Sequence, residues 1–163
     1  EDGPGRDGAL LLDAEEQAER IAAARRAARG EGVELYINAR TDPYVRKAGE
    51  EGTRCDESVR RARMYLEAGA DGVFVPLAPN ADIERLAAAI PAPLNVIAGP
   101  GSPTIAELGA LGVARVSLGP HLARSVMAYV RRAATEVLER GTYDALREQV
   151  TSPEANALFT RGS

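Results

Sequence analysis

The chain has 163 residues, of which 45% are hydrophobic and 27% are charged, a composition that excludes a disordered or collagen-like protein. Its net charge of −4 argues against a nucleic-acid partner, because nucleic-acid-binding domains usually carry basic patches. No apolar run approaches the roughly 18 residues of a membrane span, and one cysteine, Cys55, fits the reducing cytoplasm. The first residue is Glu1 rather than methionine, so we expect the natural start to precede this sequence.

Helical and β-type patterns alternate along the chain. The first helix is predicted to begin after Asp13, whose side chain can cap it, and to end at Gly30. The predicted strands cover residues 33–40, 72–75, 94–97 and 113–118. The later predicted helices cover residues 56–69, 80–90, 103–111 and 120–140, followed by a short helix in the tail. Ser102 is expected to cap the helix over 103–111.

Strands that alternate with helices indicate βαβ units and a parallel sheet. Either a small doubly wound sheet or part of a (β/α)8 TIM barrel, which needs about 250 residues, fits this pattern. Four strands and the missing initial methionine favour part of a barrel. Half a barrel alone would leave two sheet edges open, so we expect about a third of the parent chain to lie outside this sequence. We predict an α/β fold in which residues 1–141 form the C-terminal part of one barrel domain, roughly strands 5–8. Residues 142–163 form a tail.

Arg40 is the clearest candidate for a functional residue. It ends the first predicted strand, where barrel enzymes place catalytic groups, and its guanidinium fork matches a carboxylate or a phosphate. Strand alternation places Tyr36, Asn38 and Arg40 on one face, which we expect to line the barrel interior. The alternative is that Arg40 pairs with a neighbouring acid such as Asp42 for structure alone.

Four other polar residues are candidates for binding. Asn95 lies within an apolar strand and Ser117 lies near the end of the last one, so each either meets a ligand or ties down a loop. Glu1 and Asp2 are adjacent acids, which can bind Mg²⁺ directly or through water. They can equally form a solvated, frayed terminus.

Three motifs follow one another in a specific order and spacing. They read Asn38-Ala39-Arg40-Thr41-Asp42, then Glu67-Ala68-Gly69-Ala70-Asp71-Gly72-Val73-Phe74-Val75, then Leu108-Gly109-Ala110-Leu111-Gly112-Val113. With these motifs the chain resembles the isocitrate lyase/phosphoenolpyruvate mutase superfamily, from Glu1 to the end of the long helix. It is most similar to the short-loop, phosphonomutase-like branch.

The resemblance implies a Mg²⁺-dependent barrel, with Mn²⁺ as an alternative ion. Such enzymes act on small 2-oxo or 2-hydroxy carboxylates by C–C or P–C bond chemistry, through an enolate. Arg40 matches the family arginine that holds the substrate carboxylate or phosphonate, and Glu1 matches the acid that reaches the metal through water. We therefore expect a substrate site with Arg40 as its catalytic residue and with Asn38, Asn95 and Ser117 beside it.

The sequence departs from the family's lyases at two places. Those lyases carry a Lys-Cys-Gly-His lid after the Glu-Asp pair, whereas residues 3–8 here read Gly-Pro-Gly-Arg-Asp-Gly. After the second motif the lyases place a glutamate and the mutase a histidine, whereas this chain has Pro76. The resemblance therefore implies the scaffold, the anion site and the metal site, but not the isocitrate lyase reaction.

A metal-dependent lyase or mutase-like enzyme is thus the expected function. One alternative is a barrel enzyme that binds a phosphorylated substrate with the glycine-rich loops 99–103 and 119–120, although such glycines are often only turn residues. The other is a barrel that lost its lid and no longer catalyses a reaction.

The helix over 120–140 predicts an oligomer. Met127 and Tyr129 widen its apolar stripe beyond the single stripe of a monomer's surface helix. The resemblance adds a mode, in which this helix is exchanged between neighbouring subunits. We expect a homo-oligomer; the alternative is that the tail covers the second apolar side within one chain.

Overall fold

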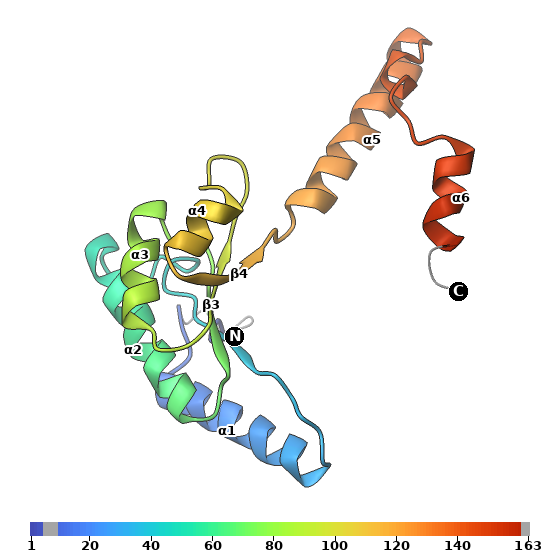
Figure 1. Cartoon of the computed structure of the whole chain (residues 1–163). Coiled ribbons are helices and arrows are strands. Elements are labelled where there is room, and N and C mark those ends of the chain that lie inside the picture. The colour runs from blue at the N-terminus through green and yellow to red at the C-terminus, as the bar shows by residue number, and fades with distance from the viewer. Residues whose placement is uncertain (5–9, 161–163) are drawn as a thin grey trace. The chain divides into compact units, whose positions relative to one another are not determined.

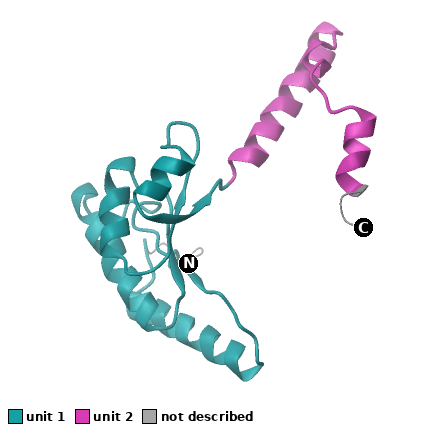
Figure 2. Cartoon of the chain, in the orientation of Figure 1, with its two compact units in different colours: residues 1–119 teal, residues 120–163 magenta. Residues whose placement is uncertain are grey.

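The computed structural model describes residues 1–4 and 10–160, which fall into two compact units, 1–119 and 120–163 (Figures 1 and 2). The first unit contains α1 (Ala14–Gly30), β1 (Asn38–Arg40), η1 (Glu51–Thr53), α2 (Arg54–Glu67), β2 (Gly72–Val75), α3 (Asn80–Ala89), β3 (Leu94–Ile97), α4 (Ile105–Ala110) and β4 (Val113–Ser117). The second contains α5 (His121–Arg140), η2 (Asp144–Leu146) and α6 (Ser152–Thr160). The predicted domain boundary after residue 141 stays a prediction.

The first unit is built on one parallel sheet with the strand order β1-β2-β3-β4. Alternate strand residues form its apolar face, on which α1 to α4 pack (Figure 1): Ala39, Val73, Val75, Leu94 and Val96. A doubly wound sheet would carry helices on both faces, so the one-sided packing and the parallel strands match the predicted barrel segment. The opposite face carries Arg40, Phe74 and Asn95.

The first strand is shorter than predicted. Residues 33–37 are not part of the sheet, and the β1–β2 ladder begins at the pair Asn38 and Gly72. The Asp71 side chain explains the boundary, because one of its oxygens accepts the backbone N–H of Ile37 at 2.7 Å. Residues 33–36 are exposed, so their β-type pattern has no sheet to join within this unit.

Side-chain caps set two helix starts. Asp13 caps α1 as predicted, accepting the backbone N–H groups of Glu15 at 2.9 Å and Glu16 at 3.3 Å. The expectation for Ser102 was wrong. The helix begins two residues later than predicted, because Thr104 and Glu107 form a reciprocal capping box there.

In the second unit, η2 folds back on the C-terminal part of α5. The helix ends at Gly141, whose φ of 66° is the left-handed conformation that glycine adopts easily. Glu136 then accepts the backbone N–H groups of Asp144 and Ala145, each at 2.7 Å, which fixes η2 against the helix. Several apolar side chains of α5 remain exposed within this unit: Leu122, Val126, Met127, Val130 and Leu138.

Within residues 1–4 and 10–160, no helix combines the length and the apolar character needed to cross a membrane. The expected cytoplasmic location stays a prediction.

Candidate functional site

Arg40 ends β1 on the face of the sheet that faces away from the helices. It pairs in register with Phe74 of β2, and its Cζ atom lies 5.9 Å from the centroid of that ring. The same lateral row continues through Asn95 of β3 to Arg115 of β4. The row therefore carries two guanidinium groups, one aromatic ring and one amide across the four strands.

A buried carboxylate fixes the orientation of Arg40. Its Nε and Nη2 atoms lie 2.6 and 3.2 Å from the two carboxylate oxygens of Asp42, whose side chain is almost fully buried. Burial by itself disfavours the charged guanidinium, but the hydrogen bond and the charge of Asp42 outweigh it, and the pKa of Arg40 is raised. The structural pairing considered as an alternative is thus present, and it uses one edge of the guanidinium fork.

The other edge of Arg40 meets Glu1. The Nη1 atom lies 2.8 Å from a carboxylate oxygen of Glu1, and the two side chains are 31% and 55% exposed. This ion pair is therefore accessible, unlike the pair with Asp42. A ligand can reach the guanidinium from this side by displacing or sharing Glu1.

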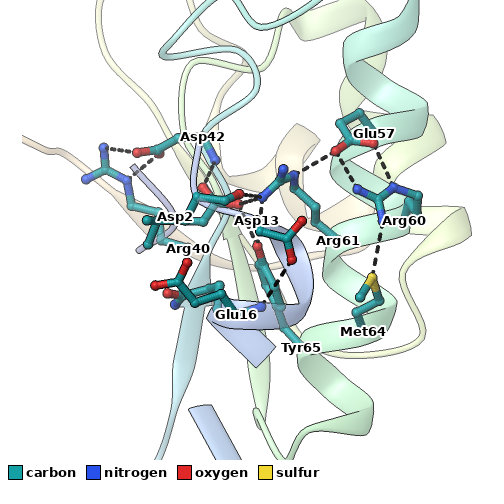
Figure 3. Close-up of polar contacts among 12 residues, drawn as sticks. Asp2, Asp13, Glu16, Arg40, Asp42, Glu57, Arg60, Arg61, Met64 and Tyr65 are labelled. Carbon is teal, nitrogen blue, oxygen red and sulfur yellow. Dashed lines mark hydrogen bonds and ion pairs between the residues drawn. The ribbon is translucent and has the colours of Figure 1, made fainter. Parts of the chain in front are cut away.

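Asp2 has a different environment from Glu1, although the two are adjacent. It is fully buried, and one oxygen accepts the backbone N–H of Asp42 at 2.7 Å. The other oxygen accepts the hydroxyl of Tyr65 at 2.7 Å and lies 3.1 Å from Nη1 of Arg61 (Figure 3). This segment is not the frayed terminus considered as an alternative, and the Asp2 carboxylate is occupied by protein donors.

The residues that anchor Asp2 come from α2 and were not predicted. Arg61 is 6% exposed, and it also binds the carbonyl oxygen of Leu12 at 2.9 Å and Glu57 at 2.7 Å. Tyr65 lies one helical turn further on and is fully buried. The four-residue spacing of Arg61 and Tyr65 was the available signal, since such residues share a helix face. Sequence alone does not show that this face meets Asp2.

The other predicted substrate-binding residues lie on the same face of the sheet as Arg40, without a hydrogen bond to it. Asn38 is half-buried in β1. Asn95 is buried, and its side-chain oxygen has no hydrogen-bond partner within the described parts of the chain. Ser117 is half-buried, and its hydroxyl oxygen accepts the backbone N–H of Gly119 at 3.2 Å. Their roles stay predictions.

The predicted short lid continues through Gly5, Arg6, Asp7 and Gly8, which lie outside the described residues. After β2, Pro76 is buried and offers no acid or base to a substrate.

The glycine-rich loops of the alternative phosphate site make internal hydrogen bonds. The N–H of Gly119 is donated to Ser117, and the N–H of Gly99 is donated to the Ser102 hydroxyl at 3.0 Å. The carboxylate of Glu107 accepts the backbone N–H of Thr104 at the N-terminus of α4. Its negative charge would repel an anion at that place. These contacts do not favour phosphate binding by the two loops.

The carboxylates around Arg40 do not form a complete metal centre. Among residues 1–4 and 10–160, no cluster of three or more His, Cys, Asp or Glu side chains could hold an ion. Asp2 and Asp42 are held by protein donors, so Glu1 is the exposed carboxylate of the three. Mg²⁺ is often bound by one or two carboxylates together with waters and substrate oxygens, so Glu1 fits a share in such a site and not the whole of it.

Two solved structures are similar to this chain in both fold and sequence. A candidate lyase/mutase from Burkholderia cenocepacia J2315 superposes with a TM-score of 0.88 at 33% identity, over 99% of this chain and 58% of that one. A candidate phosphonomutase from the same organism gives a TM-score of 0.75 at 44% identity, over 82% of this chain and 55% of that one. The similarity confirms the predicted barrel class for the four-stranded segment.

Among curated proteins, an oxaloacetate decarboxylase from Ectopseudomonas mendocina is 34% identical over 149 residues, which are 89% of this chain and 44% of that protein. The chain thus spans about half the length of the relatives it matches. The family model described as phosphoenolpyruvate phosphomutase matches residues 1–138, which include every residue of the site around Arg40. The chain therefore belongs to the phosphoenolpyruvate phosphomutase family.

Proposed function

We propose that the whole protein is a lyase or mutase-like enzyme for a small 2-oxo or 2-hydroxy carboxylate, and that Arg40 holds the substrate carboxylate. The observation that carries this proposal is the fixed, partly exposed guanidinium at the carboxyl end of a parallel strand. Active sites of (β/α)8 barrels lie at that end. The similarity to an oxaloacetate decarboxylase supports a 2-oxo carboxylate as the substrate class.

The hydrogen-bond pattern of Arg40 leaves donors for a substrate. A guanidinium has five N–H groups; Asp42 accepts from Nε and Nη2, and Glu1 forms an ion pair with Nη1. The second N–H of Nη2 and those of Nη1 remain for a carboxylate that displaces or shares Glu1, and it can bind the two terminal nitrogens with two parallel hydrogen bonds. Because Asp42 prevents the fork from rotating, the substrate carboxylate would be held in one orientation.

The positive charge of Arg40 also suits the chemistry of an enolate. When a bond next to a carbonyl group breaks, negative charge moves onto the carbonyl oxygen, and a fixed cation nearby stabilises it. Asn38, Asn95 and Ser117 are proposed to contact the rest of the substrate from the same face of the sheet. The unpartnered side-chain oxygen of Asn95 supports this role, because a buried amide oxygen costs stability until a donor reaches it.

Magnesium belongs to the proposal through Glu1, which would contact the ion through a water molecule. A bound Mg²⁺ ion polarises substrate oxygens and stabilises an enolate. A phosphonopyruvate hydrolase with the same fold, 24% identical and with a TM-score of 0.74, has been solved with oxalate and Mg²⁺.

Oxalate binding to the whole protein tests the role of Arg40, because oxalate is a planar mimic of an enolate of this class. In calorimetric titrations with Mg²⁺, we expect Arg40→Lys to raise the oxalate Kd about 10- to 100-fold, since lysine cannot make the paired contact. Arg85→Lys is the matched control, because Arg85 lies in α3 on the helical side of the sheet and pairs with Asp56, and it should change the Kd less than about twofold. An unchanged Kd in Arg40→Lys would refute the proposed role.

Assays with 2-oxo and 2-hydroxy acids then separate an enzyme from a barrel that binds without catalysis. Turnover that is lost in Arg40→Lys supports the proposal. Tight oxalate binding without turnover of any such acid points to the non-catalytic alternative.

We also propose that the whole protein is a homo-oligomer in which α5 packs on a neighbouring subunit. The support is the exposure of apolar α5 side chains within their own unit, such as Met127 at 68% and Leu138 at 84%.

A further inference from the structure

The candidate site is connected to the middle of α2 by one buried carboxylate. The two oxygens of Asp2 serve different partners: one accepts the backbone N–H of Asp42, and the other accepts from Arg61 and Tyr65. Asp2 is distant in sequence from all three partners, which lie 40, 59 and 63 positions further along the chain. The contact therefore joins three distant segments at a single point (Figure 3).

Both carboxylates that contact the Arg40 guanidinium are connected to Asp2. Glu1 is the residue next to Asp2, so the place of the Asp2 backbone limits where the Glu1 carboxylate can lie. Asp42 presents its backbone N–H to Asp2 and its carboxylate to Arg40. A displacement of Asp2 would therefore change both edges of the guanidinium fork together.

We propose that Arg61 and Tyr65 are positioning residues of the substrate site, which act through Asp2 to hold Glu1 and Asp42 against Arg40. This inference rests on the proposed function of Arg40. The residues lie on a helix behind the sheet and touch neither Arg40 nor the open face, so their effect on a ligand is transmitted by hydrogen bonds. It deepens the proposed site by adding the two α2 residues that preorganise it.

The strength of the connection follows from its burial. Asp2, Arg61 and Tyr65 are each 6% exposed or less, so water cannot replace a donor that is removed. Arg61 is itself held in place by Glu57 and by the carbonyl oxygen of Leu12. A buried carboxylate that loses one donor moves toward its remaining donors, and shifts of this kind beyond the ligands commonly weaken binding or activity about 10- to 100-fold.

The variants Tyr65→Phe and Arg61→Lys of the whole protein test the connection. Tyr65→Phe removes one hydroxyl and keeps the ring, so it is the variant most certain to fold. Arg25→Lys is the matched control, because Arg25 of α1 also binds backbone carbonyl oxygens and a carboxylate, those of Leu35, Gly69 and Asp71, away from the site. Each protein is titrated with oxalate and Mg²⁺, its Tm is measured, and the exchange of the Asp42 amide proton is followed by NMR.

We expect Tyr65→Phe and Arg61→Lys to raise the oxalate Kd about tenfold and to accelerate exchange of the Asp42 amide. Arg25→Lys should lower the Tm to a similar extent and leave both the Kd and this amide unchanged. A wild-type Kd in Tyr65→Phe, or an equal loss of binding in Arg25→Lys, overturns the positioning role. If Arg40→Lys itself binds oxalate normally, the proposed function fails instead. In that case the exchange rate of the Asp42 amide proton alone tests whether Tyr65 acts on Asp42 through Asp2. A wild-type exchange rate in Tyr65→Phe would overturn that connection.

Discussion

The carboxylate of Asp71 accepts the backbone N–H of Ile37 at 2.7 Å, immediately before the first paired residues of β1 and β2. The guanidinium of Arg25 pairs with the same Asp71 oxygen and also binds the carbonyl oxygen of Gly69. The Asp71 side chain therefore marks the boundary between the exposed residues 33–36 and the first paired residues of the sheet, and Arg25 of α1 holds Asp71 in place.

Replacing Asp71 should destabilise the first unit. We expect Asp71→Ala to lower the free energy of unfolding by about 1–2 kcal/mol, a value near the lower end for charged hydrogen bonds because the side chain is partly exposed. Denaturant titration monitored by circular dichroism measures this change. Asp56→Ala is the control, since Asp56 pairs with Arg85 in an exposed ion pair and should cost less than about 0.5 kcal/mol. Equal losses in the two variants would contradict the prediction.

Glu57 should make stability depend on pH. Hydrogen bonds from Arg60 and then from Arg61 lower the pKa of Glu57 in the folded protein, against an unfolded value of about 4.3. The stabilisation is therefore fully present above the unfolded pKa and is lost as the pH falls through the folded pKa. Glu57→Gln should lower the free energy of unfolding at pH 6 by about 0.5–1 kcal/mol, with the difference shrinking toward pH 3. Denaturant titrations at several pH values measure the free energy of unfolding of the wild type and of Glu57→Gln. If the difference between them does not change with pH, the ion pairs of Glu57 contribute nothing to stability.

Gly3 should not tolerate a side chain. A Cβ atom there would lie 2.9 Å from an oxygen of Asp42 and 2.9 Å from Nη2 of Arg46. The end of Arg46 can move, but Asp42 is buried and held by Arg40. We therefore expect Gly3→Ala to cost about 1–3 kcal/mol and to weaken oxalate binding several-fold, as measured by denaturant titration and calorimetry.

Gly109→Ala is the matched control for this prediction. Gly109 lies within α4 with open space around the added methyl group, so alanine should stabilise the helix by about 0.5–1 kcal/mol and leave oxalate binding unchanged. Wild-type stability and binding in Gly3→Ala would show that the contact between Gly3 and Asp42 adapts freely.

The exposed apolar side of α5 should determine the oligomeric state. We expect light scattering at micromolar concentration to give the mass of a dimer or larger oligomer for the whole protein. Val130→Glu should shift that mass toward the monomer, because a charge buried in a contact without a partner is costly. Arg131→Glu, at a neighbouring exposed position, should leave the oligomer intact. A clean monomer in the wild type would end the helix-exchange proposal.

The sequence alone determined the parallel α/β architecture, because short β-type runs alternate with helices that have local stops. Gly141 illustrates this, since its left-handed conformation ends α5 at the predicted place. The order of the family motifs likewise predicted Arg40 as a site residue, and that role stays a prediction. The sequence prediction failed where two capping signals competed. Ser102 was expected to cap α4, but Thr104 and Glu107 form a capping box and the helix begins after Thr104.

Only the tertiary structure decided which of the two adjacent acids, Glu1 or Asp2, is buried and which is exposed. Glu1 and Asp2 are adjacent and chemically equivalent in the sequence, yet one is exposed beside Arg40 and the other is fully buried. The difference arises because α2 brings Arg61 and Tyr65 to Asp2 from about 60 residues away, and no periodicity in the chain encodes a contact between segments so distant. Hydrogen-bond donors gathered by packing, and not the acids themselves, determine which carboxylate is buried and structural and which stays exposed beside Arg40.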